Sequence, residues 1–192
     1  MNKKIKLLAF SGSLRKDSWN HQLVSLAATA ARDAGAEVEL ISLQDYPLPF
    51  LNQDTEESLQ DLPELLALRS LFSSCDGLLI ASPEYNGSLS SALKNTLDWL
   101  SRPAFDNSYT PNYTEKTVGL LSASPGGLGG IRGLNHLRDI LTSLGSLVVP
   151  QQLALGSAYE AFNETGQLTN EVMADSVRGI AQAVIQIIQH KA

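Results

Sequence analysis

The sequence contains few of the residues from which metal sites and disulfides are built. Among its 192 residues there is one cysteine, Cys75, and there are only three histidines, His21, His136 and His190. A single cysteine cannot form an internal disulfide, which suits a reducing compartment, and isolated histidines lack the spacing of metal ligands. We therefore expect a cytoplasmic protein without a metal site, in which Cys75 is a buried structural thiol.

Long apolar runs and clusters of positive charge are missing as well. The run Ile5–Phe10 contains a lysine and is shorter than the ~7–15 residues of a signal-peptide core. No later run approaches the ~18 residues of a membrane-spanning helix. Lysine and arginine number 14 against 20 aspartates and glutamates, a net charge of −6. Because nucleic acids and anionic lipids are bound through clustered cations, we expect no nucleic-acid partner and no membrane insertion.

The apolar residues that are present, 43% of the chain, alternate between strand and helix patterns. Strands are expected at Ile5–Phe10, Glu37–Leu43, Gly77–Ser82, Thr117–Ala123 and, interrupted, Leu147–Leu155. Helical periodicity is found in the segments 23–34, 62–75, 89–100, 131–144 and 177–188. This alternation predicts one domain, residues 1–192, with a parallel sheet covered by helices on both faces. Ligands of such sheets bind beyond the carboxyl ends of the strands.

The loop after the first strand, "FSGSLRKDSWN", combines small polar side chains with one cation. Gly12 permits a tight turn, and backbone N–H groups at the start of the following helix can bind an anion. Ser13, Ser18 and Asn20 add neutral donors, and the guanidinium of Arg15 matches phosphate oxygens. The stretch fits a terminal phosphate monoester. An ordinary N-cap loop with a surface arginine is the alternative.

The loop after the third strand begins "SPEYNGS". Pro83 fixes the backbone, Asn86-Gly87 is a turn pair, and Tyr85 supplies a flat ring that could lie against a planar heterocycle. The alternative is a plain polar turn. Glu84 is a candidate general base, but a loop carboxylate is more often only solvated.

The loop after the fourth strand, "SASPGGLGGIRG", is rich in glycine. It does not match the dinucleotide motif G-x-G-x-x-G, since Arg132 occupies the last position when the count starts at Gly127. A flexible connection is one interpretation. Arg132 is a candidate for holding a nicotinamide-nucleotide phosphate, but a solvated surface arginine is the favoured interpretation.

Three motifs in this order, G-S-L-R-x-x-S-x-N, P-E-Y-N-G-S and L-K-N-x-x-D-W-x-S-R, are similar to those of the NADPH-dependent FMN reductase family. That family includes quinone, chromate and azo-dye reductases. The resemblance covers about residues 5–150. It implies a flavodoxin-like three-layer α/β sandwich with a five-stranded parallel sheet in the order 2-1-3-4-5.

The resemblance also implies where FMN binds. The first loop would hold the phosphate, the P-E-Y-N loop would run along the isoalloxazine ring, and the S-P-G-G loop would close the other side. The residues expected to bind FMN are Ser11, Ser13, Leu14, Arg15, Ser18, Asn20, Pro83, Glu84, Tyr85, Asn86, Gly87, Ser124, Gly126 and Gly127. NADPH or NADH would donate hydride to the flavin, and a small acceptor would then take the electrons in the same slot by a ping-pong mechanism. No catalytic side chain is expected.

The sequence departs from the family pattern at two places. Ser90-Ser91 stands where the family usually has Pro-Gly, and Ser90 can still cap the helix. The stretch Ala104–Lys116 is longer than usual and could change substrate choice. The implied homodimer or homotetramer could use apolar surface at Trp99 and Phe105, unless Trp99 packs in the core.

Two other classes of function stay open. A flavodoxin-like electron carrier or FMN-binding regulator would use no nicotinamide, but the sequence lacks the usual flavodoxin phosphate loop. An acyl hydrolase would need the nucleophile elbow G-x-S-x-G, which does not occur, and neither His21 nor His136 shows a recognisable pairing with a serine.

Overall fold

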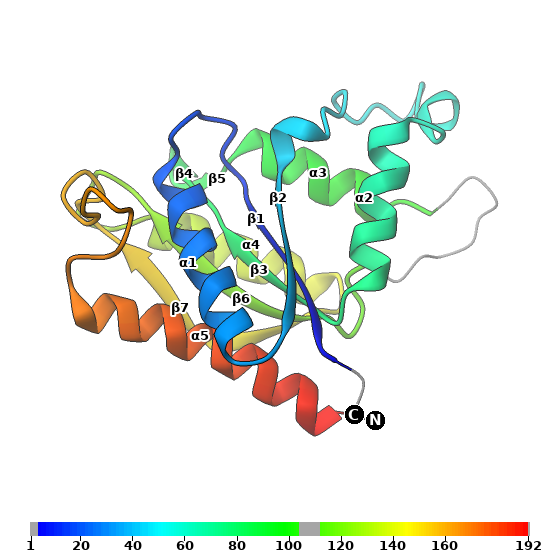
Figure 1. Ribbon diagram of the computed structural model, residues 1–192. Coiled ribbons are helices and arrows are strands. Elements are labelled where there is room, and N and C mark those ends of the chain that lie inside the picture. The colour runs from blue at the N-terminus through cyan, green and yellow to red at the C-terminus, as the bar shows by residue number, and fades with distance from the viewer. Residues whose placement is uncertain (1–3, 104–111, 192) are drawn as a thin grey trace.

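A five-stranded parallel sheet forms the middle layer of the protein (Figure 1), whose computed structural model describes residues 4–103 and 112–191. Its strands are β1 (Lys6–Ser11), β2 (Glu37–Ser42), β3 (Gly77–Ala81), β6 (Thr117–Ala123) and β7 (Leu147–Leu155). They lie in the order β2-β1-β3-β6-β7. Counted along the sheet's own strands this is 2-1-3-4-5, so the expected topology is confirmed.

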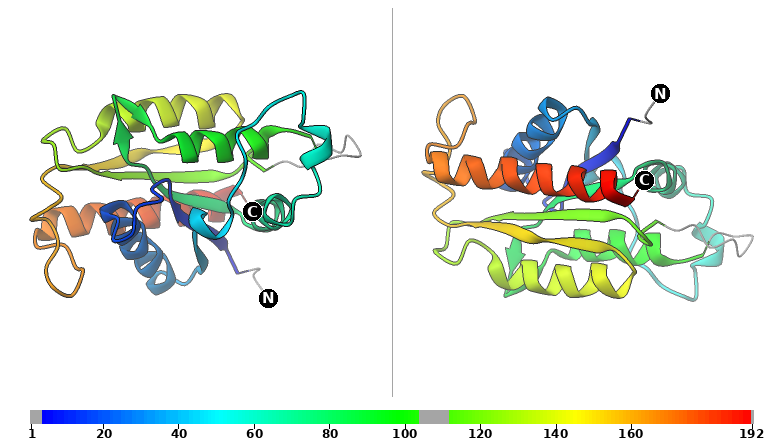
Figure 2. Two further views of the ribbon diagram at one scale, coloured as in Figure 1. Left: turned by 90° about the horizontal axis from the view of Figure 1, so that it is seen from above. Right: turned by 90° about the horizontal axis from the view of Figure 1, so that it is seen from below.

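Helices cover both faces of this sheet. They are α1 (Trp19–Asp33), α2 (Pro63–Ser74), α3 (Ser91–Ser101), α4 (Ile131–Ser143) and α5 (Glu171–Lys191). Figure 2 shows the sheet between α3 and α4 on one side and α1 and α5 on the other, and α2 packs into the same apolar cluster as α3. Among the described residues, no helix has the length and apolar character needed to cross a bilayer.

The burial of each strand explains its sequence pattern. Strands β3 and β6 are buried at every position, as expected of central strands covered on both faces. Strand β2 alternates because it lies at an edge. Strand β7 is continuous, not interrupted. It tolerates Pro150 because it is the other edge strand and its register against β6 shifts between Val118 and Leu120.

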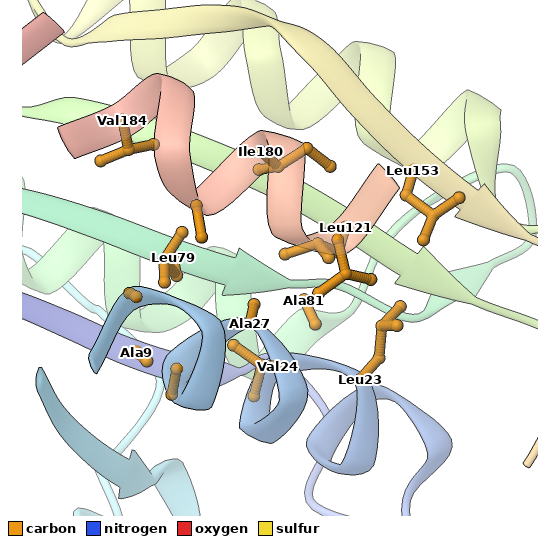
Figure 3. Close-up of a cluster of buried hydrophobic side chains, with 14 of the residues drawn as sticks. Ala9, Leu23, Val24, Ala27, Leu79, Ala81, Leu121, Leu153, Ile180 and Val184 are labelled. Carbon is orange, nitrogen blue, oxygen red and sulfur yellow. The ribbon is translucent and has the colours of Figure 1, made fainter. Parts of the chain in front are cut away.

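Two apolar clusters hold the layers together. Figure 3 shows the cluster in which Leu23 and Val24 of α1 and Ile180 of α5 meet Leu79 and Leu121 of the sheet. The other cluster lies under α2, α3 and α4.

Trp99 belongs to this second cluster and is fully buried, so it packs in the core and presents no surface to a partner. Phe105 lies outside the described residues. Cys75 is buried, as expected, and burial raises the pKa of its thiol.

The sequence pattern missed several short elements. Strands β4 (Glu84–Tyr85) and β5 (Ser88–Leu89) form an antiparallel hairpin in the P-E-Y-N-G-S loop. Two 3-10 turns, η1 (Leu43–Asp45) and η2 (Glu57–Leu59), interrupt the segment after β2. Helix α5 also begins six residues before the first apolar position of its periodic stripe, at Glu171.

Candidate functional site

Three loops meet at the carboxyl edge of the sheet, beyond the adjacent strands β1, β3 and β6. They are residues 12–18, the hairpin segment 82–90 and the glycine loop 124–130, gathered at the upper left of Figure 1. Strand order reverses beside β1, because β2 lies on one side of it and β3 on the other. A ligand site is expected at such a switch point.

The loop 12–18 folds around its own serines. The backbone N–H of Ser13 donates to Ser11 Oγ at 3.1 Å, and that of Arg15 donates to Ser13 Oγ at 3.3 Å. Ser18 is the N-cap of α1, and its Oγ accepts from the N–H of His21 at 3.4 Å. In these contacts the serine oxygens accept, so their hydroxyl hydrogens can still donate to a ligand.

The start of α1 has the electrostatics of an anion site. The first turn of the helix contains no acidic residue, so the positive end of the helix dipole is not neutralised from within that turn. Arg15 is exposed beside it, with its guanidinium carbon 5.0 Å from the centre of the Trp19 ring and Nη1 donating to Lys16 O at 3.4 Å. Leu14 is half exposed at the tip of the loop.

Asn20, which the sequence analysis expects to bind phosphate, forms two hydrogen bonds within the protein. Its Nδ2 donates to Ala123 O and its Oδ1 accepts from Ala123 N, both at 2.8 Å, and the residue is only 4% exposed. The amide therefore ties α1 to the end of β6. Only the second hydrogen of Nδ2 is left for a ligand.

The hairpin presents Tyr85 at the site. Asn86 (φ 52°) and Gly87 (φ 82°) both have left-handed backbone, as a tight type I′ hairpin turn requires. Tyr85 is 53% exposed, so its ring is accessible to a ligand. Ser90 ends the segment. It caps α3 as predicted, accepting from the N–H of Leu93 at 3.2 Å, and its hydroxyl donates to Gly12 O at 2.5 Å.

Glu84 is not the solvated carboxylate that its loop position indicated. Its side chain is 7% exposed. Its Oε1 accepts from the guanidinium of Arg132, with Nε at 2.8 Å, and its Oε2 accepts from the N–H of Gly133 at 3.1 Å. Burial would raise the pKa of this carboxyl, but the hydrogen bonds from Arg132 and Gly133 and the Arg132 charge outweigh it and lower the pKa. Arg132 is therefore paired, not freely solvated.

The glycines of the loop 124–130 divide into two kinds. A Cβ at Gly129 would collide with Ala154 and one at Gly130 with Ser122, so packing demands glycine there. A Cβ at Gly126 would have only Ser124 Oγ within 4 Å, and one at Gly127 would meet nothing. Open space therefore lies along Gly126 and Gly127.

One buried polar side chain links each pair of these loops. Ser90 joins the hairpin segment to the loop 12–18, Asn20 joins the start of α1 to the end of β6, and Glu84 joins the hairpin to the start of α4. Together the open glycine backbone, the exposed Tyr85 ring and the unneutralised end of α1 fit an elongated group with a flat part and an anionic tail.

Sequence reasoning missed the residues that support the site from outside. Gln44 Nε2 donates to Leu14 O and so holds the tip of the first loop. Asn95 Nδ2 and Trp99 Nε1 both donate to Pro49 O, at 2.9 and 2.8 Å, which fixes the loop after β2 on α3. Asn95 and Trp99 belong to the third motif, and their spacing of four residues on one helix face was the available signal.

His136 does pair with a serine, contrary to the sequence expectation. Its Nδ1 lies 3.1 Å from Ser88 Oγ at the exposed edge of the hairpin. The pair fastens β5 to α4, but it has no nucleophile elbow around Ser88 and so gives no support to a hydrolase.

The fold is that of a flavodoxin-like α/β protein, and the three loops at its switch point have the shape and donors to suit a phosphorylated, planar cofactor. The model of the NADPH-dependent FMN reductase family matches residues 5–160. The chain belongs to this family.

Named relatives agree with that assignment. An NAD(P)H:quinone oxidoreductase of Solanum tuberosum is 36% identical, over 94% of this chain and 91% of the relative. An NAD(P)H-dependent FMN reductase of Pseudomonas aeruginosa is 33% identical over 98% and 96%. Among solved structures, the flavoenzyme NAD(P)H:(acceptor) oxidoreductase FerB of Paracoccus denitrificans superposes with a TM-score of 0.80 at 28% identity, covering 97% of this chain and 98% of that one.

Proposed function

We propose that this protein is an FMN-dependent NAD(P)H oxidoreductase that reduces a quinone, a chromate or azo compound, or a similar small acceptor. The observation that carries the proposal is the cradle of three tied loops at the switch point of a flavodoxin-like sheet, in a chain of the FMN reductase family. Relatives named as quinone reductase and as azoreductase support an acceptor of this kind.

Different residues of the cradle would bind different parts of the cofactor. Ser13, Arg15 and Ser18, with backbone N–H groups at the start of α1, would bind the phosphate of FMN. Ser11 and Leu14 shape this loop, the first through its bond from Ser13 N and the second at the exposed tip.

The planar part of FMN would lie between the other two loops. Tyr85 and the backbone of Pro83, Asn86 and Gly87 would line one side, and Ser124, Gly126 and Gly127 the other. The open space at Gly126 and Gly127 supports this placement, because no packing contact requires glycine at either position.

The redox chemistry, hydride uptake from a reduced nicotinamide and electron transfer to an acceptor, is what bound FMN supplies. The protein itself binds FMN and orients the reactants against it. A fixed geometry of this kind lowers the activation barrier of the reaction by holding the reactants in place. Tyr85 offers a rigid, half-exposed surface to the ring. No described acid or base is needed as a catalyst.

We also propose a cytoplasmic enzyme that acts as a homodimer or homotetramer. The single buried thiol supports a reducing compartment. A groove of about 760 Å³, lined among others by Tyr85, Leu89 and Ile140, lies beside the hairpin on the α3 and α4 face, where a second subunit could complete the open side of the site.

Visible spectroscopy tests the central proposal. Purified protein supplied with FMN should show a bound flavin spectrum that bleaches when NADPH or NADH is added without oxygen, and colour should return when a quinone is added. Protein that binds no FMN overturns the proposal. Protein that binds FMN but oxidises neither nicotinamide at a useful rate is the electron carrier instead.

A further inference from the structure

The N-terminus of α4 has no capping side chain of its own. Gly130 occupies the N-cap position with φ 91°, and no side-chain cap bond is formed there. A side chain at this position would collide with the fully buried Ser122. The N–H of Ile131 donates to Leu128 O at 3.1 Å, which leaves the next N–H groups of the helix to find acceptors elsewhere in the chain or in solvent.

Glu84 of the hairpin supplies such an acceptor. Gly133 is the third residue of α4. An N-cap side chain normally accepts a hydrogen bond from the N–H of the second or third residue of a helix. It donates to Glu84 Oε2 at 3.1 Å, while Arg132 Nε donates to Oε1 at 2.8 Å. Both carboxylate oxygens are thus engaged by the first turn of the same helix.

The backbone of the hairpin lies close to the backbone of α4 at Gly133, which allows this contact. A Cβ at Gly133 would lie 3.2 Å from Ser88 O and 3.4 Å from Glu84 Cβ, so the hairpin rests closely on α4 and a side chain here would push it outward by a few tenths of an ångström. Glu84 is 7% exposed and Arg132 60% exposed. The carboxylate is enclosed between the two elements, and the guanidinium covers it from the solvent side.

We propose that Glu84 is a positioning residue for FMN, which fixes the hairpin against the glycine loop through α4 and does not itself contact the cofactor. Tyr85 stands next to Glu84 in β4, and Gly127 precedes the cap of α4 by three residues. The bond from Glu84 to Gly133 therefore sets the gap between the two walls of the ring site. The part of this inference that concerns FMN rests on the proposed function.

The same contact decides where an anion can bind. Glu84 neutralises the positive end of α4, while the first turn of α1 holds no acidic residue. Of these two helix starts at the carboxyl edge, only that of α1 is left to receive the phosphate.

Four variants separate the cap from the ion pair. E84A removes both, E84Q keeps an oxygen for the Gly133 N–H but loses the charge, R132A removes only the ion pair, and E84Q/R132A combines the last two. We expect E84A to raise the dissociation constant of FMN about tenfold or more, because it leaves a charge-assisted cap unmade. E84Q and R132A should each raise it by about threefold or less, since the guanidinium of the pair is 60% exposed and solvent weakens its attraction. Their double variant should equal either single one, because both remove the same pair.

Hydrogen exchange of the full-length chain gives the second readout. In E84A, with or without FMN, exchange of the backbone amides of residues 124–133 should accelerate about tenfold, and E84Q should restore most of the protection. R178A is the matched control, since Arg178 pairs with Glu171 and Asp175 on the exposed face of α5. It should change neither readout.

Two results would overturn the positioning role of Glu84. One is an FMN affinity of E84A within twofold of the wild type, and the other is unchanged hydrogen exchange at residues 124–133. If E84A does not fold, additive effects of E84Q and R132A on FMN affinity overturn it equally. If wild-type protein binds no FMN, the proposed function fails while the exchange comparison still decides whether Glu84 fixes these loops.

Discussion

Replacing Asn20 with alanine tests whether this side chain is a structural tie or a phosphate ligand. The sequence motif pointed to a ligand, whereas the structure uses both amide atoms to bind the backbone of Ala123 across 103 residues of chain. A structural tie should reveal itself without any cofactor. A ligand should affect only the protein that carries FMN.

The size of the effect follows from the two bonds at 2.8 Å. In Asn20→Ala the N–H and C=O of Ala123 lose their partners in a site that is 4% exposed in the intact protein. Each unsatisfied buried group costs ~1–3 kcal/mol. A water entering the space of the lost amide would recover part of this. We expect the free energy of unfolding to fall by about 2–4 kcal/mol, a large share of the ~5–15 kcal/mol of an ordinary domain.

Urea unfolding of FMN-free protein, followed by circular dichroism, measures this change. Asn20→Asp keeps an acceptor for the Ala123 N–H but places a second oxygen against the Ala123 carbonyl, so it should not rescue stability. Thr29→Ala, on the exposed side of the same helix, should stay within about 0.5 kcal/mol. If Asn20→Ala unfolds like the wild type without FMN but has lost FMN affinity, then Asn20 is a phosphate ligand and its role as a structural tie is refuted.

Arg15→Ala should raise the dissociation constant of FMN by about tenfold to a hundredfold with little change in hydride transfer at saturating FMN; an unchanged constant in a fluorescence titration would remove Arg15 from the site. Gly130→Ala should lower the free energy of unfolding by about 2–4 kcal/mol, because its backbone is left-handed and the new Cβ would collide with Ser122. Gly179→Ala, with open space around it, should raise this free energy slightly. Equal urea midpoints for the two variants would contradict the prediction. Burial, with the charge of Asp98 adding to it, raises the pKa of Tyr113 well above its ordinary value. The folded state therefore keeps this proton above about pH 10 while the unfolded state loses it, so stability should fall as pH rises there. Tyr113→Phe should lack this loss between about pH 9 and 11, and identical slopes for both proteins would refute it.

The sequence allowed the sheet to be predicted because its signals are local. Uniform apolar runs identify central strands such as β3, and alternation identifies the edge strand β2. The hairpin was not predicted, because each of its strands has only two residues, too few to show an alternating pattern. Asn86-Gly87 is nevertheless a strong turn signal. The loops that form the site could be found from their motifs, since they follow predicted strands.

The roles of single polar residues could not be predicted, because each depends on a partner far along the chain. The sequence position of Glu84 indicates a solvated loop carboxylate. Its partner Arg132 lies 48 residues further along the chain, and the two meet only because the chain between them folds into α3 and β6 and returns as α4. Asn20 depends in the same way on Ala123. A motif shows which side chains are used but not whether they face the ligand or the neighbouring loop.

The three ties explain why a cofactor site can contain polar residues that need not touch the cofactor. A loop that is already fixed loses less conformational entropy when the ligand binds, so rigidity contributes to affinity without a contact. Ser90, Asn20 and Glu84 each direct their hydrogen bonds to a neighbouring segment. In the proposed site, backbone N–H groups, the hydroxyls of Ser13 and Ser18, Arg15 and the Tyr85 ring would then be left for the ligand. On the proposed role of Glu84, the acid of P-E-Y-N would shape the site through its bonds to Arg132 and Gly133.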